Sequence, residues 1–489
     1  MLRPLRRRFP ALAACVAAVL SAVAVAACGG AGTSHAPAAT SPPTATASAT
    51  TTSSGAGTPT SGTGATQTTS APSPVTYGIA DSQGRFAGCT AGDPFCCDPG
   101  TARCDSAALE GYFDQPAFTR LTSAASAHRV SEVRMFVSYD AVMQWNGSTT
   151  SPGCVYSRVL QHPWLDPGGG SHPAAESISD LIAGLIEAHA DGLTPVVSIA
   201  GYSTLSVKPP WDAPAPDPTT TGGYWEYRCG VQGILATLSR LPGDIQPHVW
   251  EAFNEPDALK IFRSETGPQA RSCAVSATPQ PDGAAKAACD EVIASRVIHG
   301  YAGHGGDTVI AGTFERPDTR YLKVYAAQLT REMPGGAFPR TWSVHDYVDV
   351  DRAYDGLSSS ELSGFDDALE HDTGGRATSL WITEAGTVLT SRTRTGDCPA
   401  AGIDVAGTLG ACLNGQPARQ QASADEFFAL PTVADAVPIT HLFWYEFTSA
   451  AWWDSGLVDT AGAPRVSYCA FYGSGSCTGD PYAPAPPPA

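Results

Sequence analysis

The chain has 489 residues, of which 29 are basic and 47 are acidic, so its formal net charge is −18. At about 150 residues per domain, this length suggests roughly three domains. An acidic surface repels phosphate groups, which excludes nucleic acid as a partner. The sequence contains a single long apolar run, at its N-terminus, which excludes a polytopic membrane protein.

The N-terminus has the pattern of a bacterial export signal. A basic segment with four arginines precedes an apolar run from Ala11 to Ala27, and the sequence Val-Ala-Ala-Cys ends this run at Cys28. This ending resembles the lipobox of bacterial lipoproteins, whose cysteine is acylated and becomes the mature N-terminus. We therefore expect residues 1–28 to be a lipoprotein-type signal peptide with Cys28 as the lipidation site. A plain cleaved signal with a coincidental cysteine is the alternative.

Residues 29–75 are rich in Thr, Ser, Ala, Gly and Pro and contain no charged side chain. Such a segment has too little apolar surface to offset the entropy of ordering, so we expect a disordered tether. Without the four signal arginines, 25 basic and 47 acidic residues remain, and the charge becomes −22. We expect a monomeric extracellular protein that contacts the cell membrane only through its lipid anchor. Residues 479–489 form a Pro-rich tail.

Cysteine usage also indicates export. Of the 14 cysteines, Cys15 lies in the signal and Cys28 is the expected lipid site, which leaves 12. An even number of cysteines in an exported protein suggests disulfides. The short-range candidates are Cys273 with Cys289, Cys398 with Cys412, and Cys469 with Cys477. A further cluster could pair internally or hold a metal ion, although it lacks the spacing of a zinc site; its members are Cys89, Cys96, Cys97 and Cys104.

From residue 77 onward, short apolar segments alternate with helical patterns. The expected strands are 77–80, 132–137, 194–199, 249–253, 308–311, 341–345, 379–383 and 441–445. The expected helices begin at 177 or lie near 115–128, 231–241, 284–301, 321–333, 365–369, 422–430 and 465–472. Eight such repeats predict an α/β fold, a (β/α)₈ TIM barrel with long βα loops over residues 76–478. A doubly wound sheet is the alternative, but no glycine-rich phosphate turn follows the first strand.

Two of the expected strands deliver a glutamate to their C-terminal ends. The fourth strand runs into Asn254-Glu255-Pro256, and the seventh ends at Glu384. In a barrel, the C-terminal ends of all strands meet at one mouth, where barrel enzymes place their sites. Two carboxylates that face each other, one ionised and one protonated, are what retaining glycoside hydrolysis requires.

These motifs resemble those of glycoside hydrolase clan A, above all its cellulase-type and its β-xylosidase- or iduronidase-type families. The resemblance covers about residues 77–475. It implies that Glu255 is the catalytic acid/base, that Glu384 is the nucleophile, and that Asn254 contacts the sugar 2-hydroxyl.

Four further positions fit the same resemblance. Arg134 on the second strand matches an arginine that the clan places beside the nucleophile, where its charge would keep Glu384 ionised. His345 and Tyr347 match a His-x-Tyr motif, in which Tyr347 would donate a hydrogen bond to the nucleophile. Trp444, or alternatively Tyr445, would form an aromatic floor beneath the sugar.

The sequence thus predicts a retaining glycoside hydrolase that acts on an oligosaccharide or polysaccharide by double displacement, with cleavage of β-linked O-glycosidic bonds. The expected separation of the two carboxyl groups is about 5–5.5 Å, whereas inversion would require more than about 6.5 Å. This reaction needs no metal ion and no organic cofactor. The alternative is a catalytically inactive, surface-tethered carbohydrate-binding protein on a barrel scaffold, which would have no need for both glutamates.

Overall fold

The chain divides into two compact units, and every residue described below belongs to the second, Ser73–Ala489. In the computed structural model, the described residues are 74–81, 113, 115–139, 142–146, 153–156, 164–165, 171–172, 178–200, 223–258, 272–273, 283–352, 360–387, 417–448, 455–458 and 464–473. The expected signal peptide, Cys28, the tail and residues 29–73 of the expected tether lie outside these residues.

Eight parallel strands close into a barrel in the order β1, β2, β7, β8, β9, β10, β11, β12, and β12 returns to pair with β1. Their bounds are β1 Thr76–Asp81, β2 Val130–Ser138, β7 Thr194–Ala200, β8 Val249–Glu251, β9 Thr308–Phe314, β10 Thr341–His345, β11 Ser379–Ala385 and β12 Ile439–Tyr445. The eight strands expected from the sequence are confirmed. Closure of the sheet makes the doubly wound alternative wrong.

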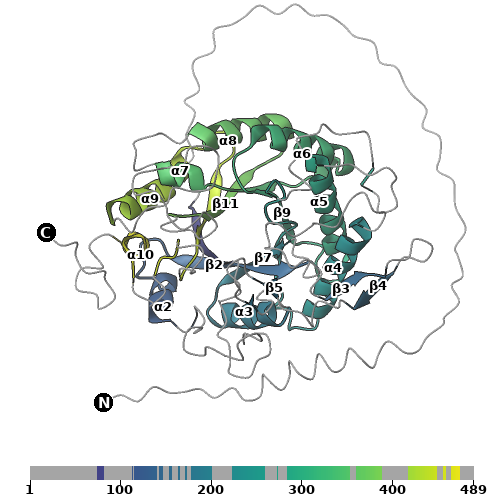
Figure 1. Ribbon diagram of the computed structural model, residues 1–489, viewed down its shortest axis with the longest axis horizontal. Helices are drawn as coiled ribbons and strands as arrows, with labels where there is room; N and C mark the ends of the chain where they lie inside the picture. Colours follow the sequence, from purple (N-terminus) through teal and green to yellow (C-terminus); the bar gives the residue numbers. More distant parts are fainter. Residues whose placement is uncertain are drawn as a thin grey trace, which may run out of the picture. The chain divides into compact units, whose positions relative to one another are not determined.

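Helices form an outer ring around the strands (Figure 1). They are α2 Pro116–Thr122, α3 Ile178–Ala190, α4 Gly223–Leu238, α5 Gly283–Gly300, α6 Thr319–Glu332, α7 Tyr347–Arg352, α8 Ser360–Thr373, α9 Pro417–Ala429 and α10 Val466–Tyr472. Figure 1 shows α3, α4, α5 and α6 following one another in chain order, whereas α8 lies between α6 and α7, and α7 lies next to α9. Among the described helices, none combines the length and the apolar composition that crossing a membrane would require.

The segment between β2 and α3 carries two small antiparallel pairs outside the barrel. One joins β3 (Met143–Trp145) to β4 (Cys154–Tyr156), and the other joins β5 (Trp164–Leu165) to β6 (Ser171–His172). The hairpin of β3 and β4 lies beside α4 (Figure 1). Two short 3₁₀ turns complete the described elements, Gly335–Ala337 after α6 and Leu430–Thr432 after α9.

The barrel strands are buried on both faces, as expected for parallel strands covered by helices. One cluster of side chains fills the inside of the barrel and comes from β1, β7, β9, β11, β12 and the start of α7: Ala80, Val196, Ile310, Tyr347, Trp381, Phe443 and Tyr445. Large aromatic side chains fill the layer between strands and helices, where Trp250, Trp342 and Trp444 are fully buried. Burial of each such side chain contributes on the order of 2–3 kcal/mol to folding.

Two disulfides are defined among the described residues. Cys273 pairs with Cys289 of α5, which confirms one expected short-range bond. Cys154 of β4 pairs with Cys229 of α4 across 75 residues, a separation that no local spacing could indicate. Cys469 of α10 is also disulfide-bonded, but its expected partner lies outside the described residues, as do the other expected pair and the N-terminal cluster.

Helix α4 packs closely against the residue that follows β2, and this contact allows a test of the fold. A methyl group at Gly230 would overlap the backbone oxygen of Tyr139. We expect Gly230→Ala to lower the free energy of unfolding by roughly 2–3 kcal/mol, because backbone atoms cannot move aside as a flexible side chain can. Urea titration followed by circular dichroism measures this.

The matched control is Gly364→Ala on α8. Gly364 is an exposed helical position with no atom within 4 Å of the added methyl group. This variant should be as stable as the parent or up to about 1 kcal/mol more stable, because alanine favours helix. Equal stability of the two variants would contradict the packing described here.

Candidate active site

Arg134 of β2 lies fully buried at the centre of a hydrogen-bonded network at the barrel mouth. Its Nε donates to Oε2 of Glu251 at 2.7 Å, and its Nη1 donates to Oε1 of Glu384 at 2.6 Å. Its Nη2 donates to Oδ1 of Asn254 at 2.7 Å and to Oγ of Ser198 at 3.2 Å. A single guanidinium therefore orients side chains from β7, from β8 and the residues after it, and from β11.

Glu384 receives a hydrogen-bond donor on each of its carboxylate oxygens. Arg134 donates to Oε1, and the hydroxyl of Tyr347 donates to Oε2 at 2.8 Å. Tyr347 is the first residue of α7, a helix that the sequence did not predict. Oδ1 of Asp346 accepts from the backbone N–H of Asp349 at 3.3 Å, which favours a helix start at this point. The hydrogen bond at the start of α7 thus helps to position Tyr347, and Tyr347 in turn orients the carboxylate of Glu384.

Glu255 follows β8 on a backbone that few L-residues adopt. Its φ is +46°, in the left-handed region, and its N–H donates to the carbonyl of Thr313 at 2.9 Å. Thr313 is itself left-handed, with a φ of +52°. Each such conformation costs on the order of 1 kcal/mol and persists only when the surroundings enforce it. We infer from this backbone strain that the surrounding structure holds Glu255 in place because of the position it gives to the side chain.

His345 ends β10 between the two glutamates. Its Nδ1 lies 2.8 Å from Oε1 of Glu255 and 3.6 Å from Oε2 of Glu384. Burial lowers the pKa of the imidazole to about 4, so the ring is neutral near pH 7. A neutral ring can hydrogen-bond to Glu255 without adding a second buried cation next to Arg134.

The two glutamates experience different environments. Burial raises the pKa of Glu255 to about 7; Arg134 opposes the rise, and the negative charge of Glu251 adds to it. Burial also raises the pKa of Glu384, but there the Arg134 guanidinium and the Tyr347 hydroxyl stabilise the ionised form directly. The side chain of Glu255 is 26% exposed and that of Glu384 is 6% exposed, so solvent and a ligand can reach the former.

The structure brings together six of the seven residues that the sequence singled out for this site: Arg134, Asn254, Glu255, His345, Tyr347 and Glu384. It also adds Glu251, which the sequence analysis passed over. Glu251 is fully buried and forms an ion pair with Arg134 at 2.6 Å. The sequence does contain an indication of this role, because an acidic residue such as Glu251 inside an otherwise apolar strand requires a buried partner.

The structure corrects the expectation that Trp444 lies beneath the sugar. Its ring is fully buried against Phe427 of α9, and its Nε1 donates to the carbonyl of Ser455 at 2.9 Å. Successive side chains of a strand point to opposite faces, and Trp444 lies on the face toward the helices. Tyr445, the alternative, points into the barrel, where its ring lies 6.3 Å from that of Tyr347.

A carboxylate oxygen of Glu255, a ring nitrogen of His345 and a carboxylate oxygen of Glu384 all lie within 4.8 Å of one another. Three such groups could ligate a metal ion. The arginine that already donates to Glu384 disfavours a cation at this place, because two positive charges would share one buried carboxylate. The arrangement is better suited to proton transfer and nucleophilic attack.

No family model matches the chain, and none of the curated proteins does. Solved structures similar to it include a fungal β-1,4-galactanase (13% identity, 72% of this chain and 90% of that chain, TM-score 0.44). A second is a family 5 xyloglucanase from Paenibacillus pabuli (12% identity, 81% of this chain and 96% of that chain, TM-score 0.44). A third is the GH53 catalytic domain of Ignisphaera aggregans (14% identity, 82% of this chain and 98% of that chain, TM-score 0.44). At such identities, the likeness concerns the barrel scaffold alone.

The raised pKa of Glu255 predicts a pH-dependent loss of stability. Below about pH 4.5 this carboxyl is protonated in both the folded and the unfolded chain. As the pH rises through about 7, the folded chain must ionise a buried group, and stability is lost. Glu255→Gln should therefore gain about 2 kcal/mol relative to the parent between pH 5 and pH 8, as measured by urea unfolding.

The control for this prediction is Glu370→Gln, which removes an exposed carboxylate on α8. It should change stability by less than about 0.5 kcal/mol at both pH values. A Glu255→Gln variant that follows the parent at pH 5 and at pH 8 would show that this carboxyl is not strained by burial.

Proposed function

We propose that this chain is a retaining glycoside hydrolase that cleaves β-linked O-glycosidic bonds in an oligosaccharide or polysaccharide. The observation that carries this proposal is the pairing of Glu255 with Glu384 at the barrel mouth. An oxygen of one carboxylate lies within 4.8 Å of an oxygen of the other. Retaining enzymes hold their carboxyl groups about 5–5.5 Å apart, whereas inverting enzymes need about 6.5–9.5 Å for a water molecule. The observed spacing supports attack by a carboxylate.

In the proposed first step, Glu384 attacks the anomeric carbon while Glu255 donates its proton to the departing glycosidic oxygen. A covalent glycosyl-enzyme forms and the leaving group departs as an alcohol. In the second step, Glu255 accepts a proton from water, which attacks the same carbon and releases Glu384. Two displacements at one carbon retain its configuration.

The surroundings of each glutamate support this division of roles. Glu384 is the one in direct contact with a guanidinium, so it is the better candidate for an ionised nucleophile. Glu255 has a pKa of about 7 and is partly exposed, so it can hold a proton and meet the leaving group. In this proposal, Asn254, whose Oδ1 accepts a hydrogen bond from Arg134, contacts the sugar hydroxyl next to the anomeric carbon.

The finer assignments are also part of this proposal. The Asn254-Glu255-Pro256 motif and the His345-Asp346-Tyr347 motif support membership of clan A, in its cellulase-type or its β-xylosidase- or iduronidase-type families. The basic and apolar N-terminus supports export, lipidation at Cys28 and a place on the outer face of a bacterial membrane.

Chemical rescue tests the nucleophile. Glu384→Ala should reduce hydrolysis of an activated aryl β-glycoside on the order of 10⁴-fold, because no group remains to attack the anomeric carbon. Azide should restore part of the rate and give the α-glycosyl azide, which nuclear magnetic resonance identifies. Undiminished turnover in the variant would rule out Glu384 as the nucleophile. A panel of aryl glycosides and polysaccharides is needed first to find the sugar.

The acid/base assignment predicts the alkaline side of the pH profile. Protonated Glu255 is the active form, so kcat/KM should fall as the pH rises through about 7. In Glu255→Ala this descent should disappear, and substrates with good leaving groups should lose less activity than those with poor ones. An unchanged alkaline limb in the variant would assign the acid to another residue.

These experiments also separate the enzyme from the carbohydrate-binding alternative. A binding protein would retain a saccharide in calorimetry and show no turnover with any glycoside of the panel. For such a binding protein, the affinity for the saccharide would not change as Glu255 gains or loses its proton.

A further inference from the structure

A second cluster of ionisable side chains lies at the opposite end of the barrel from the two glutamates. His248 directly precedes β8 and Asp307 directly precedes β9, while His304 lies in the turn between α5 and β9. Because Glu255 follows the C-terminal end of β8, these residues belong to the N-terminal face of the same sheet. The proposed hydrolysis makes no use of them.

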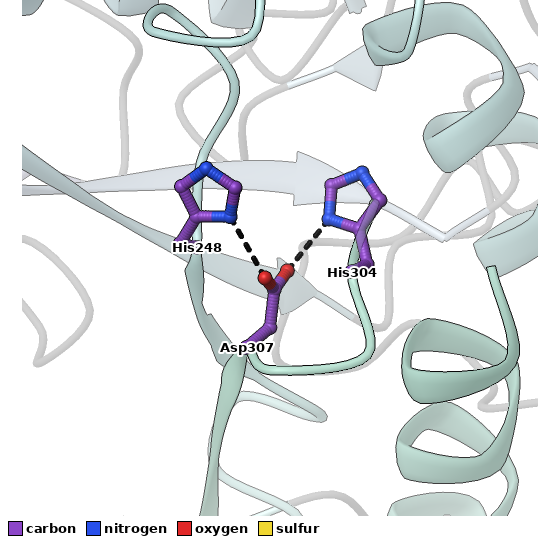
Figure 2. Close-up of side chains that lie close together, drawn as sticks. All are labelled: His248, His304 and Asp307. Atoms are coloured by element: carbon purple, nitrogen blue, oxygen red, sulfur yellow. Dashed lines mark hydrogen bonds and ion pairs between the residues drawn. The ribbon is translucent and has the colours of Figure 1, made fainter. Parts of the chain in front are cut away.

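The two imidazoles converge on the one carboxylate, as Figure 2 shows. Nδ1 of His248 lies 2.7 Å from Oδ1 of Asp307, and Nδ1 of His304 lies 2.6 Å from Oδ2. All three donor atoms lie within 4.8 Å of one another. Bonds of an ion to nitrogen and oxygen near 2.0–2.2 Å would require shifts of about 1 Å or less.

We propose that His248, His304 and Asp307 form a binding site for a borderline divalent metal ion, with Zn²⁺ as the representative. Two imidazole nitrogens and one carboxylate are a donor set that suits Zn²⁺, Co²⁺ or Ni²⁺, whereas Mg²⁺ and Ca²⁺ prefer oxygen ligands alone. The single negative charge of the set offsets part of the charge of the ion. No cationic side chain among the described residues is paired with this carboxylate other than the two imidazoles.

The surroundings of Asp307 are those of a metal-ligating carboxylate. Its side chain is 2% exposed, and the indole Nε1 of Trp250 donates to its Oδ2 at 2.7 Å. Such an outer hydrogen bond fixes the orientation of a ligand. His304 is fully buried, and its Nε2 has no hydrogen-bond partner among the described residues, so Nδ1 is its one engaged ring atom.

His248 supplies the route from solvent. Its side chain is 54% exposed, in contrast to the buried His304 and Asp307. An ion could therefore enter beside His248 and keep water in its remaining coordination positions. Its role would be structural, because the ligands come from the segments that lead into two adjacent strands. In TIM barrels, residues at the N-terminal face contribute to stability, whereas residues at the C-terminal face carry out catalysis.

Calorimetric titration of the metal-stripped, disulfide-intact full chain with Zn²⁺ alone tests the site. We expect one equivalent to bind, with a rise in Tm of about 2–4 °C at saturating zinc. His248→Gln should weaken this binding at least tenfold, and its exposed side chain can be replaced without disturbing the core. Co²⁺ should give the visible absorption of a nitrogen- and oxygen-ligated ion, which the variant lacks.

Two controls exclude other sites. His189→Gln removes a similarly exposed histidine, 45% accessible and 3.5 Å from Asp244, and should bind zinc as the parent does. Glu384→Gln should also bind as the parent, which separates this site from the barrel mouth. Absence of a one-equivalent zinc site, or equal zinc affinity in His248→Gln, would overturn the proposal and leave a hydrogen-bonded brace. Neither result depends on whether the chain hydrolyses a glycoside.

Discussion

The barrel mouth is organised by the burial of one guanidinium between two carboxylates. Arg134 is fully buried, and so is Glu251, so removal of the guanidinium would leave the Glu251 carboxylate buried without its counter-charge. Breaking such a buried pair costs about 3–5 kcal/mol, although the pair itself adds little net stability over apolar packing. Its value here is positional, because the remaining donors of Arg134 are directed at Glu384 and Asn254.

The same guanidinium separates the properties of the two glutamates. Glu384 receives Arg134 and Tyr347 directly, whereas Glu255 hydrogen-bonds to the neutral His345. The two carboxylates thus have different hydrogen-bond partners, and separate environments of this kind are what acid/base and nucleophilic roles require. Glu255 adopts a left-handed backbone conformation, so the position of its carboxylate comes with a local cost in stability.

The two ends of the barrel use polar residues differently. At the mouth, charged side chains project from the middle of β2 and from the C-terminal ends of β8 and β11 toward a common point. At the other end, Asp307 gathers two imidazoles and an indole around one carboxylate. The apolar filling of the barrel includes residues from the middle of the strands, such as Val196 of β7 and Ile310 of β9.

The sequence by itself determined the repeat of strands and helices, because apolar runs and helical periodicity are local properties. It also placed Glu255 and Glu384 at strand ends, and a closed barrel then brings any two such ends to one mouth. Only the tertiary structure decided that Trp444 faces the helices, because a shift of one residue along a strand reverses the face. Likewise, the bond between Cys154 and Cys229, the pairing of Glu251 with Arg134, and the contact of His248 with Asp307 join residues that are far apart in sequence. Contacts of this kind depend on how strands and helices pack in three dimensions, and local sequence patterns do not encode that packing.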